Sequence, residues 1–73
     1  MIEFIKVIAK TPNDEKKEYM FMGDLCNPFD TNRLSKFITD CRNDCADYYG
    51  VPDEWDADEW YSKSKTEWEV IKY

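Results

Sequence analysis

The chain has 73 residues, of which 16 are Asp or Glu and 10 are Lys or Arg, so its net charge is −6. This acidic balance excludes nucleic-acid binding through a general phosphate-contact surface, which requires clustered Lys and Arg. Histidine is absent, which removes the commonest general base and the commonest metal ligand. Aromatic residues make up 16% of the chain, and that share argues against disorder because each ring can bury a large apolar area. We therefore expect one domain over residues 1–73, with no enzymatic activity and no cofactor.

The N-terminal residues and the cysteines bear on the cellular compartment. An acid at position 3 and charges within the first apolar run do not fit a secretory signal, so we expect a cytoplasmic protein of the producing or host cell. The three cysteines are Cys26, Cys41 and Cys45, and an odd count argues against a disulfide framework. Cys41 and Cys45 are four residues apart in a predicted helix, so we expect reduced thiols on a buried stripe. A zinc-stabilised module that uses all three thiols is an alternative class.

Residues 2–11 predict the first β-strand. Its apolar side chains fall on both alternating faces, with Ile2, Phe4 and Ile8 on one face and Ile5, Val7 and Ala9 on the other. A strand that is covered on both faces is usually central in its sheet. Turn-forming residues at 12–17 then predict a hairpin whose second strand covers 18–22 and ends at Gly23.

The clearest predicted helix runs from about Thr31 to Tyr49. Asp30 is the predicted N-cap, with Phe29 and Leu34 at the two positions of a hydrophobic staple. Gly50 is the predicted C-terminal stop. The apolar stripe has a spacing of three and four residues and consists of Leu34, Phe37, Ile38, Cys41, Cys45 and Tyr48.

Two further elements are predicted toward the C-terminus. Asp56, followed three residues later by Glu59, resembles a capping pair, which predicts a short helix near 56–62. Residues 65–73 alternate, with Thr66, Trp68 and Val70 on one face and Glu67, Glu69 and Ile71 on the other, which predicts a half-buried strand.

This order of elements predicts an α+β fold of the ββααβ type. We expect a three-stranded antiparallel sheet with strand order 2-1-3, packed on one long helix, with the short helix before the last strand. The outer face of the first strand then needs either partial cover from loop aromatics, such as Phe29 or Trp55, or a partner.

The acidic charge is concentrated in the middle of the chain. Residues 24–62 contain ten acids against three bases, a net charge of −7, whereas the segments on either side are nearly neutral. Asp40, Asp44 and Asp47 are spaced to form a column on the solvent side of the long helix, where the helix dipole opposes anions. We expect this column and the acids of 53–59 to form one ridge, with at least one of Trp55 and Trp60 substantially exposed as an apolar anchor.

These features give three alternatives. The acidic ridge is either a solubilising surface or a docking surface for a basic, nucleic-acid-binding protein, which it would bind by imitating a line of phosphates. We favour an inhibitor that uses the acidic ridge as a docking surface. Phage-encoded antagonists of host defence are often proteins of this type, although no motif in this sequence resembles a named family. The alternative is a structural or assembly protein that forms a small homodimer through its outer sheet face. The predicted partner-binding residues are Asp40, Asp44, Asp47, Asp53, Glu54, Trp55, Asp56, Asp58, Glu59 and Trp60.

Overall fold

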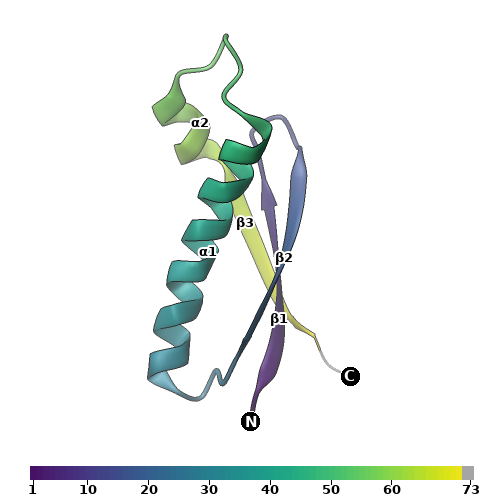
Figure 1. The fold of residues 1–73 in the computed structure, drawn as a ribbon, viewed down its shortest axis with the longest axis vertical. Coiled ribbons are helices and arrows are strands. Elements are labelled where there is room, and N and C mark those ends of the chain that lie inside the picture. Colours follow the sequence, from purple (N-terminus) through teal and green to yellow (C-terminus); the bar gives the residue numbers. More distant parts are fainter. Residues whose placement is uncertain (72–73) are drawn as a thin grey trace.

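A computed structural model describes residues 1–71 of the chain. The last two residues of the strand predicted over 65–73, Lys72 and Tyr73, lie outside the described residues. The elements in chain order are β1 (Glu3–Lys10), β2 (Lys16–Gly23), α1 (Pro28–Tyr49), α2 (Ala57–Lys63) and β3 (Lys65–Ile71). The three strands form an antiparallel sheet of order β2-β1-β3, so the predicted ββααβ arrangement is confirmed. Figure 1 shows both helices on one face of the sheet, with the start of β1 and the end of β3 at the same end of the molecule.

The register of the sheet determines which side chains share a face. Val7 lies opposite Tyr19 of β2 and Trp68 of β3, so these three side chains point to the helical side. The hairpin is closed by a turn in which the Thr11 N–H donates to the Glu15 carbonyl at 2.9 Å and Asp14 adopts φ 65°. This closure lets β2 begin at Lys16, two residues before the predicted start.

Helix α1 begins three residues before its predicted start. Asn27 is the N-cap, since its side chain accepts a hydrogen bond from the Phe29 N–H at 2.9 Å, and Pro28 occupies the first helical position. The Asp30 carboxylate instead accepts from the Asp24 N–H at 2.8 Å, which ties the β2–α1 connection to the first turn. The predicted N-cap and staple are therefore wrong, and Phe29 is 68% exposed.

The buried stripe of α1 packs on the sheet as predicted for most of its length. Leu34 and Cys41 join Ile5, Val7 and Phe21 in the hydrophobic core. The core is completed by the partly buried side chains of Tyr19, Leu25, Phe37, Ile38 and Val70. Tyr48 was assigned to this stripe wrongly, because it is 67% exposed beside β2, where Lys17 Nζ lies 4.3 Å from its ring centroid.

Helix α2 closes the end of the molecule at which α1 terminates (Figure 1). Gly50 ends α1 with φ 77°, and its N–H donates to the Ala46 carbonyl at 3.1 Å, as predicted for a C-terminal stop. Asp56 caps α2 by accepting from the Asp58 N–H at 2.8 Å, so the predicted short helix is confirmed. Trp60 of α2 is completely buried, and its indole N–H donates to the Ala46 carbonyl at 3.2 Å.

The outer face of the sheet is covered by neither helix. Met20 and Met22 of β2 are 51% and 56% exposed, and Ile2 before β1 is 63% exposed. The loop aromatics that were expected to cover this face lie elsewhere: Phe29 is in the first turn of α1, and Trp55 packs on Trp60. β1 is central in the sheet, as predicted, but its apolar core face is Ile5, Val7 and Ala9 alone.

Candidate docking surface

All eight carboxylates of the predicted docking surface are exposed. Three lie along the C-terminal half of α1, and five lie in the connection from α1 to α2 and in the first turn of α2. Figure 1 shows these segments at the same end of the molecule. Their contacts divide them into carboxylates that stabilise the fold and carboxylates that are free to meet a partner.

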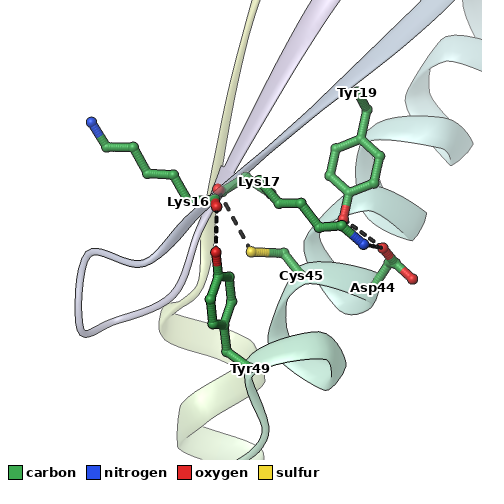
Figure 2. A network of polar contacts seen from close by, with 7 residues as sticks. Lys16, Lys17, Tyr19, Asp44, Cys45 and Tyr49 are labelled. Carbon is green, nitrogen blue, oxygen red and sulfur yellow. Dashed lines mark hydrogen bonds and ion pairs between the residues drawn. The ribbon is translucent and has the colours of Figure 1, made fainter.

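Asp44 belongs to the first group. Its carboxylate accepts from the Tyr19 hydroxyl at 2.5 Å and pairs with Lys17 Nζ at 3.0 Å, so it joins α1 to β2 (Figure 2). The Tyr19 hydrogen bond and then the Lys17 ammonium hold the pKa of the Asp44 carboxyl below its usual range. The same contact with Asp44 raises the pKa of Lys17. Asp44 is therefore a link between helix and sheet.

Two further contacts in Figure 2 strengthen this junction. The Tyr49 hydroxyl donates to the Lys16 carbonyl at 2.6 Å, and the Cys45 thiol donates to the Ala9 carbonyl at 3.6 Å. The last two turns of α1 are thus attached to both strands of the hairpin. This attachment fixes the end of the helix from which the acidic connection begins.

Asp47, Asp56, Asp58 and Glu59 also have local structural explanations. Asp47 accepts a hydrogen bond from the Tyr61 hydroxyl of α2, which raises the pKa of Tyr61. Asp56 is the N-cap of α2, and Asp58 and Glu59 lie in its first turn, where the helix dipole favours anions. The Tyr61 contact thus accounts for Asp47, and the stability of α2 accounts for the other three carboxylates, although all four keep an exposed position.

Asp40 lies one helical turn before Asp44 on α1. It borders a groove between α1 and β2 in which Arg33 and Lys36 are the basic residues. Within the predicted ridge, Asp44 is therefore engaged by β2, and Asp40 shares its groove with two basic residues of its own helix.

The remaining acidic surface lies at the end of the molecule, and we call it the acidic end. It consists of Asp53, Glu54, Asp58 and Glu59, all of which are exposed. The ion pairs in residues 1–71 are Met1–Asp24, Lys6–Glu18, Lys17–Asp44 and Arg33–Asp30, so none involves the acidic end. Asp53 and Glu54 lie outside both helices, and helix stability does not account for them.

The two tryptophans of this region were expected to supply an exposed anchor. Trp60 is 0% exposed, so it is a core residue and cannot contact a partner. Trp55 is half-buried against it, with ring centroids 5.5 Å apart and an edge-to-face angle of 69°. The prediction of an exposed tryptophan anchor is therefore wrong, because Trp60 is buried with its indole N–H bonded to the Ala46 carbonyl and Trp55 packs against it.

The cysteines are in the places that the sequence predicted. Cys41 and Cys45 are buried on the sheet-facing side of α1, and Cys26 is exposed before the helix. Burial raises the pKa of the Cys41 thiol to about 11 and also raises that of Cys45. Residues 1–71 contain no group of three His, Cys, Asp or Glu side chains that could hold a metal ion.

Sequence reasoning missed the two β2 side chains that bind Asp44. Lys17 and Tyr19 are two residues apart and so point to the same face of a strand, which is a signal the sequence does contain. Which carboxylate they meet depends on the angle between α1 and the sheet, and the sequence pattern does not give that angle.

Comparison of the chain with protein-family models, with curated proteins and with solved structures found no match. No helix in the part of the chain that the structure describes has the length and apolar character needed to cross a membrane.

Proposed function

We propose that this chain is a small protein-binding module whose acidic end docks on the basic, nucleic-acid-binding surface of another protein in the cytoplasm. The observation that carries the proposal is the acidic end itself: four exposed carboxylates without an ion pair in residues 1–71. Asp53 and Glu54 are its central members, because neither caps a helix nor pairs with a cation there. Unpaired carboxylates of one sign raise the rate of encounter with a basic surface.

The structure supplies a rigid support for such a surface. Asp53 and Glu54 are followed directly by Trp55, which packs on the buried Trp60. The Trp55 N–H donates to the Pro52 carbonyl at 3.0 Å, which closes a turn around the two acids. A surface that is fixed before binding loses less conformational entropy when a partner docks.

The proposal predicts that nucleic acid and this chain compete for one surface. The chain, carrying an affinity tag, is used to capture its partner from the producing cell, and the purified partner is then titrated with duplex DNA in the presence of the bound chain. Displacement of the chain by DNA supports the proposal. A ternary complex in which DNA and the chain bind together would reject the docking site as a nucleic-acid mimic.

A second candidate function, assembly of a homodimer through the outer sheet face, is favoured by the exposure of Ile2, Met20 and Met22. Apolar side chains that lie together on one face of a small protein are typical of an interface. Sedimentation equilibrium tests it. A dimer that dissociates on Met20→Lys supports assembly, and a monomer at about 100 μM rejects an affinity in the micromolar range.

A further inference from the structure

Four lysines gather at the turn end of the sheet, in a protein with an excess of acids. The register places Lys10 of β1 directly opposite Lys16 of β2 and directly opposite Lys65 of β3, so three ammonium groups form one row on the outer face. Like charges opposite one another across strands are destabilising. Lys63 ends α2 only two residues before Lys65. Sheet stability alone therefore does not explain this arrangement.

Three of these lysines line one groove. It lies between the β1–β2 turn and the end of α2, and its lining includes Lys10, Lys63, Lys65, Thr11, Ser62 and Trp55. Asp14 is the one carboxylate among its lining residues. None of the three lysines takes part in the ion pairs of residues 1–71, so their charges are available to a ligand.

Both walls of the groove are held in place by buried contacts. On the turn side, Thr11 is 3% exposed, and its hydroxyl accepts from the Glu15 N–H at 3.2 Å. On the helix side, the buried Ser64 hydroxyl donates to the Trp60 carbonyl at 2.7 Å and fixes the step from α2 into β3. The lysine backbones are therefore pre-positioned, and a ligand has to order only their side chains.

We propose that this groove binds a small phosphate-bearing anion, with the phosphoryl oxygens held by the ammonium groups of Lys10, Lys63 and Lys65. A phosphate monoester carries close to two negative charges and three acceptor oxygens, which matches three ammonium donors against the single carboxylate of Asp14. Lysine binds phosphate as a point charge, so the site needs no bidentate geometry. Trp55 borders the groove, with Lys63 Nζ 5.8 Å from its ring centroid, and an aromatic face there can contact an apolar part of the ligand.

This site is distinct from the acidic end, because its ligand would be held by lysines of β1, β3 and the last residue of α2 and not by the carboxylates of 53–59. The test uses inorganic pyrophosphate as the probe, at neutral pH and constant ionic strength, with the backbone amide shifts of 10–16 and 62–66 followed by NMR. We expect saturable shifts confined to these segments. Adenosine diphosphate is a second probe, and an additional shift of the Trp55 indole N–H with this probe alone would identify a ligand with a ring.

Three variants make the test specific. The double change Lys63→Gln and Lys65→Gln should weaken pyrophosphate binding by about tenfold or more, since it removes two charge-assisted hydrogen bonds. Asp14→Asn should strengthen binding, because it removes the opposing charge and Asn tolerates the positive φ of this position. Lys36→Gln, which removes one positive charge from the exposed face of α1, should leave binding unchanged.

The outcomes separate this proposal from the docking proposal. Shifts that do not saturate, or that weaken equally in Lys36→Gln and in the double variant, would overturn the groove as a site and leave only non-specific attraction. The double variant Asp53→Asn with Glu54→Gln should still bind pyrophosphate. Pyrophosphate binding can therefore be confirmed even if docking through the acidic end is disproved. Thermal unfolding of each variant confirms that a lost signal is not a lost fold.

Discussion

Asp44 is an acid whose local environment reverses its expected role. It lies near the C-terminal end of α1, where the helix dipole opposes a negative charge. The Tyr19 hydroxyl and the Lys17 ammonium nevertheless bind its carboxylate, so its charge is stabilising in the folded chain. The helix dipole alone predicts that a change of Asp40, Asp44 and Asp47 together to Asn leaves stability unchanged or slightly raised. The contacts of Asp44 instead make it differ from Asp40.

The first prediction compares two residues of that set. Asp44→Asn should lower the midpoint of thermal unfolding, because an amide cannot replace the ion pair with Lys17. Asp40→Asn, the same change on the same helix, should leave the midpoint unchanged or slightly higher, because it relieves like-charge repulsion. Circular dichroism melts at neutral pH measure both. Equal midpoints for the two variants would show that the Lys17 contact adds nothing to stability.

The second prediction concerns pH. The Asp44 carboxyl has a pKa below its ordinary value of 3.8 in the folded chain, so its ionised form stabilises the fold above that pH. The stabilisation is lost as the pH falls through the lowered pKa. The difference in unfolding midpoint between the parent and Asp44→Asn should therefore be full at pH 7 and disappear toward about pH 2. A difference that is constant over this range would exclude the carboxylate as its source.

The third prediction concerns the thiols. Only Cys26 is exposed, whereas Cys41 and Cys45 are buried and have raised pKa values. Because the thiolate is the reactive form, an aromatic disulfide reagent should label one thiol rapidly in the native chain and three in denaturant. Cys26→Ser should abolish the rapid phase. Rapid labelling of two or three thiols in the native chain would contradict the packing of α1 on the sheet.

The packing of α2 depends on one side chain. Trp60 is completely buried and bonded to the Ala46 carbonyl, whereas Trp55 covers it from outside. The short helix has seven residues, too few to be stable alone, so its position depends on this contact. The acidic end therefore depends on Trp60 for its place on the molecule.

The fourth prediction separates the two tryptophans. Trp60→Ala should cost about 3–5 kcal/mol of unfolding free energy, a large part of the roughly 4–11 kcal/mol expected for a chain of this length. Trp55→Ala should cost only about 1–2 kcal/mol, because its ring is half-buried and it loses one edge-to-face contact. Urea denaturation measures both values. Similar costs for the two changes would mean that the ring of Trp55 contributes as much to the core as that of Trp60.

The elements themselves could be predicted from the sequence, because their signals are local. The alternation of β1, the spacing of Leu34, Cys41 and Cys45, and the Gly50 stop each involve only neighbouring residues. The predicted start of α1 was wrong because Asn27 and Asp30 are both residue types that cap helices well. In the structure the Asp30 carboxylate accepts a hydrogen bond from the Asp24 N–H of the preceding connection, which leaves Asn27 as the cap. Local patterns do not contain that contact.

The site was harder to predict, because it depends on how elements meet. Asp53 and Glu54 were identified correctly as exposed acids, since they lie in a connection without apolar periodicity. The burial of Trp60 was missed because it depends on a contact with the Ala46 carbonyl of another helix. The lysine row was missed because Lys10, Lys16 and Lys65 come together only through the register of two strand pairs.

At the end of the molecule that carries α2, acidic and basic side chains are gathered on opposite faces. The acidic end lies on the α1–α2 connection and α2, and the lysine row lies on the outer face of the sheet. The Cα trace is 45 Å long and 23 Å wide. The exposed Met20 and Met22 lie farther along β2 than Lys16 and so farther from this end. A basic partner would meet the acidic end by electrostatic steering, which screening by salt weakens.

The most direct test of the docking proposal is the association rate constant of the chain with its captured partner, measured by surface plasmon resonance at low salt and at about 0.5 M salt. Three chains are compared: the parent, Asp53→Asn with Glu54→Gln, and Glu67→Gln with Glu69→Gln. The last is the matched control, since it removes two equally exposed acids from β3. We expect the change at Asp53 and Glu54 to lower the rate constant about three- to tenfold at low salt, with the control close to the parent and all three converging at high salt. Equal rate constants for the two double variants, or a parent rate constant that salt does not change, would contradict docking through the acidic end.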